Sequence, residues 1–139
     1  MTPSGYSGTP LAKKLGLKPG MRIAVMNAPE GYGDWLAPLP PGLQLSAQPA
    51  PDCELLHWFL TQHSELVSGL PRLLALLSDG RPLWVSWPKK AARKQMPSDI
   101  DEDAIRAAAL PLGLVDIKVC AVSEIWSGLK LVLRRERRG

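Results

Sequence analysis

The sequence predicts an α/β protein of the three-layer, Rossmann-like type, whose mostly parallel sheet ends in an antiparallel hairpin. Three observations predict it. Short apolar runs bounded by turn residues alternate along the chain with segments of helical periodicity, which is typical of strand–helix–strand units. Residues 82–87 are almost continuously apolar, as expected of a central parallel strand covered on both faces. The last two apolar runs are separated only by residues 123–128, too few for a parallel crossover.

Size and composition are those of one ordinary domain. The chain has 139 residues, of which 45% are hydrophobic and 22% charged, so residues 1–139 are expected to bury a single core. No apolar run approaches the roughly 20 residues of a membrane-spanning helix, and the first residues lack a secretory signal pattern. We therefore expect a cytoplasmic protein. Cys53 and Cys120 lie in apolar stretches without zinc-site spacing and are expected to be reduced core residues.

One short helix and two strands are expected in the first third of the chain. Thr9 as an N-cap, a proline after it and a glycine beyond the end predict a helical segment over residues 9–16. The apolar run over residues 21–27, which contains isoleucine and valine, predicts the first strand. The proline-rich stretch that follows leaves room for one helical turn, over residues 34–37, before a short second strand at residues 43–46.

The middle of the chain predicts a strand, a helix and the central strand. Residues 53–60 would suit either a helix face or a strand buried on both sides, and we interpret them as the strand. Residues 61–78 are expected to be helical with a break at Gly69, because Pro71 can start a second helical piece. The central strand over residues 82–87 follows and is closed by Pro88.

The last third predicts one helix and the closing hairpin. Ser98, with Asp101 three residues later, resembles a capping box and marks the start of the helix, which a proline and Gly113 should end. Four small or apolar residues are expected to face the core. They are Ile100, Ala104, Ala107 and Ala108. Residues 114–122 and 129–134 are then expected to pair antiparallel.

Much of the formal net charge of +4 comes from a basic carboxyl-terminal tail, residues 134–139. This tail holds four of the 17 lysines and arginines. Charge runs at chain ends more often solubilise a protein than bind a partner, so neither nucleic acid nor a membrane is the expected partner.

Four separate blocks of the sequence resemble, in the right order, the bacterial family catalogued as domain of unknown function 3052. The blocks are residues 6–16, residues 27–32, residues 84–90, and residues 119–122 continuing through 126–130. The resemblance runs from about Tyr6 to Arg134. It implies no established activity.

At the level of the fold, the chain also resembles the second half of class I S-adenosylmethionine-dependent methyltransferases, whose sheet ends in a strand, a helix and an antiparallel hairpin. In those enzymes a glycine-rich loop follows the first strand, and an acidic residue ends the second. Here the loop over residues 27–33 lacks tight G-x-G spacing, and the second strand ends at Ser46 without an acid. S-adenosylmethionine is therefore disfavoured, and no cofactor is predicted.

A candidate ligand site follows from the rule that open parallel sheets bind ligands at the carboxyl ends of their strands. The residues expected there are an amide, a carboxylate, three aromatic rings and two ammonium groups. They are Asn27, Glu30, Tyr32, Trp87, Lys89, Lys90 and Trp126. The lysines predict a small anionic ligand, with phosphate or carboxylate, and the rings a stacking face.

No catalytic residue is assigned from the sequence. Serine-nucleophile and phosphate-loop motifs are missing, and Ser86 lies within the central strand as a core-adjacent residue. His57 and His63 have no partners at metal-ligand spacing, so no metal site is predicted.

The prediction is a small non-catalytic binding or regulatory module. The alternative is a minimal transferase-like enzyme, resembling a methyltransferase, that acts on a small anionic substrate. A third reading is a subunit of a complex, or a homo-oligomer, that makes contact through a sheet edge or a tryptophan-rich surface.

Overall fold

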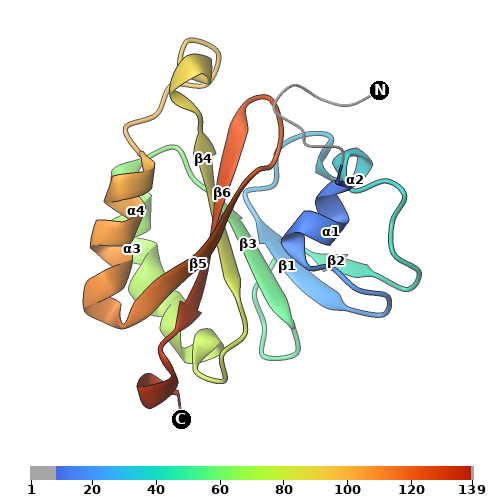
Figure 1. The fold of residues 1–139 in the computed structure, drawn as a ribbon, viewed down its shortest axis with the longest axis horizontal. Coiled ribbons are helices and arrows are strands. Elements are labelled where there is room, and N and C mark those ends of the chain that lie inside the picture. Colours follow the sequence, from blue (N-terminus) through green and yellow to red (C-terminus); the bar gives the residue numbers. More distant parts are fainter. Residues whose placement is uncertain (1–8, 139) are drawn as a thin grey trace.

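The computed structural model describes residues 9–138, which form a six-stranded mixed sheet covered by helices (Figure 1). The strands are β1 (Arg22–Met26), β2 (Gln44–Ser46), β3 (Leu55–Phe59), β4 (Leu83–Pro88), β5 (Leu114–Ala121) and β6 (Trp126–Leu133). Their order across the sheet is β2-β1-β3-β4-β6-β5. The first four run parallel, whereas β6 is antiparallel to both β4 and β5. The predicted fold class is confirmed.

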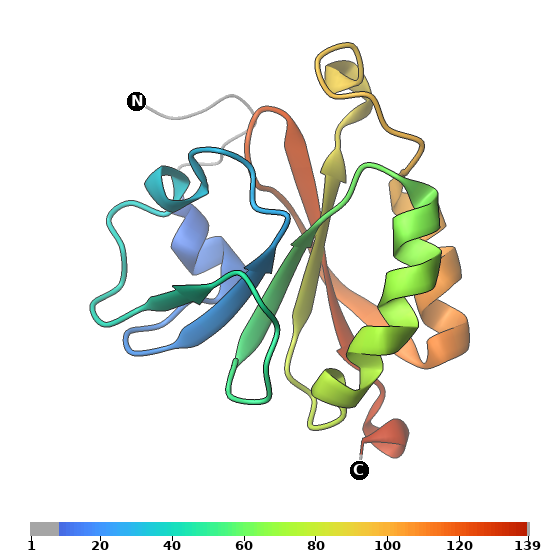
Figure 2. The same cartoon turned by 180° about the vertical axis from the view of Figure 1, so that it is seen from behind.

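Helices cover both faces of the sheet and make three layers. Helices α3 (His63–Leu73) and α4 (Glu102–Ala109) lie side by side on one face, which we call the α3–α4 face (Figure 2). The short helices α1 (Leu11–Leu15) and α2 (Tyr32–Trp35) lie on the other, the α1 face. Each face has its own apolar core cluster. Within residues 9–138, no helix combines the length and the apolar character that a membrane crossing requires.

Strands β1 and β4 are both interior, as predicted, with β3 between them. The interpretation of β3 as a strand buried on both sides is confirmed, because all five of its residues are buried. Its side chains alternate between the faces. His57 and Phe59 point to the α1 face, and Trp58 packs in the core under α3 and α4.

The two short helices differ from the prediction at their starts. Pro10, not Thr9, precedes α1 as its N-cap residue, whereas Gly16 ends the helix as expected, with a φ of 82°. The helical turn α2 covers Tyr32–Trp35 and therefore lies two residues before the predicted 34–37. It begins there because Gly31 adopts a φ of 87°, which turns the chain into the helix that early.

The predicted break of the long helix at Gly69 is wrong. Helix α3 continues through this residue, and Pro71 lies inside it. Gly69 has a packing role, because a β-carbon there would lie 2.7 Å from Cη2 and Cζ2 of Trp58. The helix can therefore pack closely on β3 only with a glycine at this position. Short 3₁₀ turns follow α3 and several other elements, at Leu74–Leu77, Lys90–Ala92, Leu110–Leu112 and Arg135–Arg137.

The start of α4 also differs from the prediction. Asp101, not Ser98, is the N-cap, and its Oδ1 accepts a hydrogen bond of 2.8 Å from the amide of Ala104. Ser98 instead donates its hydroxyl to the carbonyl of Thr61. With the helix starting three residues later, its buried face changes. Ile105 and Ala109 are buried together with the predicted Ile100, whereas Ala107 is exposed and Ala104 and Ala108 are half-buried.

The closing hairpin pairs antiparallel, as predicted. Strand β6 begins at Trp126, three residues before the expected start, because residues 126–128 already pair with the end of β4. Strand β5 is an edge strand, and its pairing with β6 is interrupted between Asp116 and Lys118. Ile117, at this interruption, is exposed.

Candidate functional site

The carboxyl ends of β1 and β3 border a cleft of about 420 Å³, which we call the edge cleft. Three of the residues expected at a ligand site line it: Asn27 and Glu30 from the loop after β1, and Trp126 from the start of β6. The other lining residues come from the same loop, from the end of β3, from α3 and from the segment before α4. They are Pro29, Phe59, Thr61, Glu65 and Met96.

Asn27 shapes the edge cleft by fixing the loop after β1. Its φ of 59° lies in the left-handed region, which asparagine tolerates better than most residues. Its Nδ2 donates a hydrogen bond of 3.0 Å to the carbonyl of Phe59, at the end of the neighbouring strand. The loop is therefore tied to β3 at the point where it leaves the sheet.

Aromatic rings and two carboxylates define the chemistry of the edge cleft. Phe59 and Trp126 meet edge-to-face, with ring centroids 5.0 Å apart, and both are buried. Glu30 and Glu65 are exposed at the rim. An apolar aromatic surface beside two carboxylates favours a ligand with an apolar body and a positive group, because ring faces and carboxylates both attract cations.

Behind the edge cleft lies a buried hydrogen-bonded network of Tyr32, His57 and Ser86, which is not among the features predicted from the sequence. The Tyr32 hydroxyl lies 2.8 Å from His57 Nδ1, and Ser86 Oγ lies 2.7 Å from His57 Nε2. The His57 ring also stacks on Phe59, with centroids 4.3 Å apart. The Tyr32 ring meets Phe59 edge-to-face, with centroids 5.5 Å apart, so two rings of the network contact the floor of the edge cleft.

Burial controls the ionisation of this network. The imidazole of His57 is fully buried, and burial lowers its pKa to about 3. Burial, reinforced by the nearby Cys120, raises the pKa of the Tyr32 hydroxyl above its usual range. His57 is therefore neutral, with one ring nitrogen donating and the other accepting a hydrogen bond. The sequence offered one signal for such a network. A histidine lies in the middle of a strand that is buried on both sides, and a buried imidazole requires polar partners.

Lys89 and Lys90 lie away from Asn27 and Glu30. Together with Trp87 they line a separate opening of about 380 Å³, where α4 begins. Its other lining residues are three carboxylates and a serine: Asp101, Glu102, Asp103 and Ser127. Trp87 belongs to the core on the α3–α4 face, whereas Trp126 belongs to that on the α1 face. The two tryptophans therefore lie on opposite faces of the sheet, and the two groups of predicted residues line different openings.

Tyr32, the seventh predicted residue, is buried and borders a third opening of about 350 Å³ between the loop after β1 and the end of β2. The residues that line it include Gly31, Gly33 and Ser46, but no carboxylate. The Ser46 hydroxyl is hydrogen-bonded within its own loop, to the carbonyl and the amide of Gln48.

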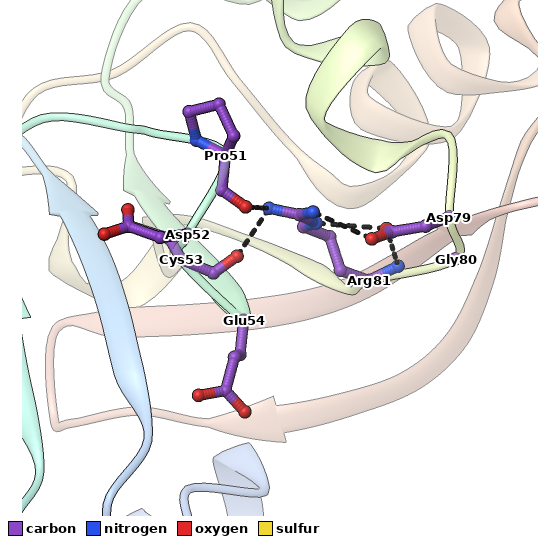
Figure 3. Close-up of a pocket in the computed structure, with 7 residues that line it drawn as sticks. All are labelled: Pro51, Asp52, Cys53, Glu54, Asp79, Gly80 and Arg81. Atoms are coloured by element: carbon purple, nitrogen blue, oxygen red, sulfur yellow. Dashed lines mark hydrogen bonds and ion pairs between the residues drawn. The ribbon is translucent and has the colours of Figure 1, made fainter.

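Another opening, of about 350 Å³, lies at the amino ends of β3 and β4, and the arginine that lines it is already bound to neighbouring protein groups (Figure 3). The Arg81 guanidinium donates to the carbonyls of Pro51 and Cys53, at 2.7 and 2.6 Å, and forms an ion pair with Asp79. Hydrogen bonds from Arg81 lower the pKa of the Asp79 carboxyl to about 2. Arg81 therefore joins the chain before β3 to the chain before β4. Between residues 9 and 138, no three His, Cys, Asp or Glu side chains gather in a way that could hold a metal ion.

Comparisons with known proteins identify the fold and the family. Residues 47–135 match the family model described as "Protein of unknown function (DUF3052)". No curated protein matches the chain. A SAM-dependent methyltransferase from Aquifex aeolicus superposes with a TM-score of 0.63 at 16% identity, covering 87% of this chain and 86% of that one. TrmN from Thermus thermophilus superposes with a TM-score of 0.53 at 12% identity, covering 89% of this chain and 47% of that one. The fold is therefore methyltransferase-like.

Proposed function

The chain belongs to the family described as Protein of unknown function (DUF3052), and we propose that it is a non-catalytic module that binds a small molecule in the edge cleft. One observation carries this proposal: the edge cleft has about 420 Å³ of space over an aromatic floor, at the sheet edge where such folds bind ligands. The buried network behind Phe59 supports the floor, so the cleft is formed before a ligand arrives.

The ligand of the edge cleft carries a positive group in this proposal. The expectation of an anionic ligand depended on Lys89 and Lys90 lying beside Asn27 and Glu30, and those lysines line a different opening. The ionisable side chains that line the edge cleft are Glu30 and Glu65. A small organic amine with an apolar body would place its positive group beside the carboxylates at the rim and its apolar part against the aromatic rings of the floor.

The burial of His57 supports a non-catalytic role. An imidazole is the commonest general base in enzymes, but it must reach the proton that it removes. His57 has no exposed surface, and both of its ring nitrogens are already hydrogen-bonded. Its place behind Phe59 suits a residue that supports the floor rather than one that exchanges protons with a ligand.

NMR titration with a panel of small aromatic and aliphatic amines tests the proposal. We expect shifts of backbone amides around Asn27 and Trp126 that saturate. Affinity should fall about tenfold in Glu30→Gln or Glu65→Gln, because each removes one charge-assisted contact. Glu136→Gln, which removes a carboxylate far along the chain in the turn Arg135–Arg137, is the matched control. If no amine binds, or if all three variants bind alike, the proposal is wrong.

A minimal S-adenosylmethionine-dependent transferase is the second candidate, supported by the likeness to methyltransferase structures. The residues present fit that cofactor poorly. The end of β2 offers Ser46, whose hydroxyl is used within its own loop, and the opening beside it has no carboxylate for a ribose. Calorimetry tests this candidate. Saturable heat that weakens in Asn27→Ala or Glu30→Ala would support it, and no heat at millimolar cofactor would exclude it.

A further inference from the structure

Like charges meet on the α1 face of the hairpin, away from the edge cleft. Lys118 of β5 and Lys130 of β6 are direct partners in the antiparallel register. Like charges directly opposite one another destabilise a sheet. The Lys130 ammonium lies 5.9 Å from the ring centroid of Trp84, the neighbouring residue on β4. Lys18, just beyond α1, adds a third charge, and we call Lys18, Lys118 and Lys130 the lysine cluster.

Contacts with α1 hold the lysine cluster in place. Lys118 Nζ donates a hydrogen bond of 3.1 Å to the carbonyl of Lys14, in α1. The Lys130 ammonium packs against the glycine that ends this helix, where a β-carbon on Gly16 would lie 3.7 Å from Nζ. The pKa of Lys130 is lowered, first by burial and then by the charges of Lys118 and Lys18. The charges of Lys118 and Lys18 therefore both act on the Lys130 ammonium.

The acidic residue closest in sequence to the cluster does not neutralise it. Asp116, two residues before Lys118 on the same strand, accepts a hydrogen bond of 3.2 Å from Arg106 of α4. Helix α4 lies on the opposite face of the sheet. The Asp116 carboxylate therefore binds Arg106 on the α3–α4 face. It does not offset the repulsion between Lys118 and Lys130 on the α1 face.

We propose that the lysine cluster is an anion-binding site that takes the phosphate group of a ligand. A phosphate dianion has the charge to relieve the repulsion that Lys118 and Lys18 exert on Lys130, and its oxygens accept several charge-assisted hydrogen bonds at once. Lysines contribute as compact point charges, which suits a rounded terminal phosphate better than a planar carboxylate. Lys18 and Lys118 are exposed, so a ligand can reach the site from solvent. This site is independent of the ligand proposed for the edge cleft.

Calorimetric titration with inorganic phosphate, pyrophosphate and a short single-stranded oligonucleotide tests the site. The test variant is Lys118→Gln/Lys130→Gln, and the matched control is Lys89→Gln/Lys90→Gln, which removes the same charge from another opening. We expect pyrophosphate affinity to fall about tenfold or more in the test variant and to stay close to wild type in the control. Pyrophosphate should also raise the melting temperature of wild type and control, but not of the test variant.

The outcomes separate the sources of the phosphate. Binding of phosphate or pyrophosphate that needs the cluster indicates a free phosphate monoester or polyphosphate. Oligonucleotide binding that needs the same two lysines and weakens steeply with salt indicates a nucleic-acid backbone. The proposal fails if wild type binds none of the three probes, or if the control loses as much affinity as the test variant. It also fails if the test variant without anion melts well below wild type, because the lysines would then hold α1 rather than a ligand.

Discussion

Acid should destabilise this protein through His57, well before the pH at which most carboxylates take up protons. Burial lowers the pKa of this imidazole from 6.5 to about 3 in the folded protein. The folded state therefore favours the neutral ring, and below pH 6.5 the unfolded state binds the proton more readily. Stability contributed by the neutral ring is present above pH 6.5 and is lost as the pH falls toward 3.

The size of the effect follows from the pKa difference. Each pH unit in this window costs about 1.4 kcal/mol of unfolding free energy, so that about 3 kcal/mol is lost at pH 4.5, two units below 6.5. Solvent does not weaken this effect, because the imidazole ring is fully buried. The loss is large beside a total stability of about 5–15 kcal/mol for a typical domain. Protonation of Asp79, whose pKa is lowered to about 2, affects the free energy of unfolding only below about pH 4, and this carboxyl is exposed to solvent.

Urea denaturation at pH 7, 5.5 and 4.5 measures this slope. The matched variant is His57→Gln, which keeps a donor and an acceptor for Tyr32 and Ser86 but does not titrate. We expect the variant to be less stable at pH 7 and to show a much flatter pH dependence between 7 and 4.5. A flat profile for wild type, or an equal slope in the variant, would refute the assignment of acid sensitivity to the buried network.

Three substitutions test the packing that positions the site. Gly69→Ala should lower the free energy of unfolding by about 1–3 kcal/mol, although alanine is the better helix former, because its β-carbon would clash with Trp58. Equal or higher stability in urea denaturation would contradict this. Arg81→Lys should lower it by about 1–3 kcal/mol, since an ammonium cannot bridge two carbonyls and a carboxylate in the same geometry. Trp84→Phe removes the donor to the Leu15 carbonyl, at 3.0 Å, and should cost about 1–2 kcal/mol in thermal melts.

The strands could be predicted from the sequence because their apolar runs are short and bounded by turn residues. Helix starts were harder, since the choice between two capping residues depends on tertiary contacts. Ser98 has the right spacing for a cap, but its hydroxyl is bound to the carbonyl of Thr61. Gly69 could equally be a helix break or a site of close packing. It allows Trp58 of β3 to approach α3 closely, and the local sequence does not reveal a contact between a helix and a strand.

The sequence predicted that the candidate site lies at the carboxyl ends of the strands, but not on which face of the sheet each of its residues lies. Asn27, Glu30 and Trp126 line one cleft, as the position of strand ends suggested. Trp87 and Trp126 lie on opposite sides because side chains alternate along a strand, and the register pairs Trp126 with Pro88 rather than with Trp87. That register depends on where β6 begins. The start predicted for β6, at residue 129, is three residues too late.

The position of β1 inside the sheet matters for anyone who dissects this protein into fragments. The family match begins at residue 47, after β1 and β2, yet β1 pairs with β3 over four residues. A recombinant piece cut at that boundary would expose an entire flank of β3, whose five side chains are all buried in the intact chain. An open strand of that kind recruits other chains. Chimaeras or truncations should therefore keep β1, which lies outside the stretch by which the family is identified.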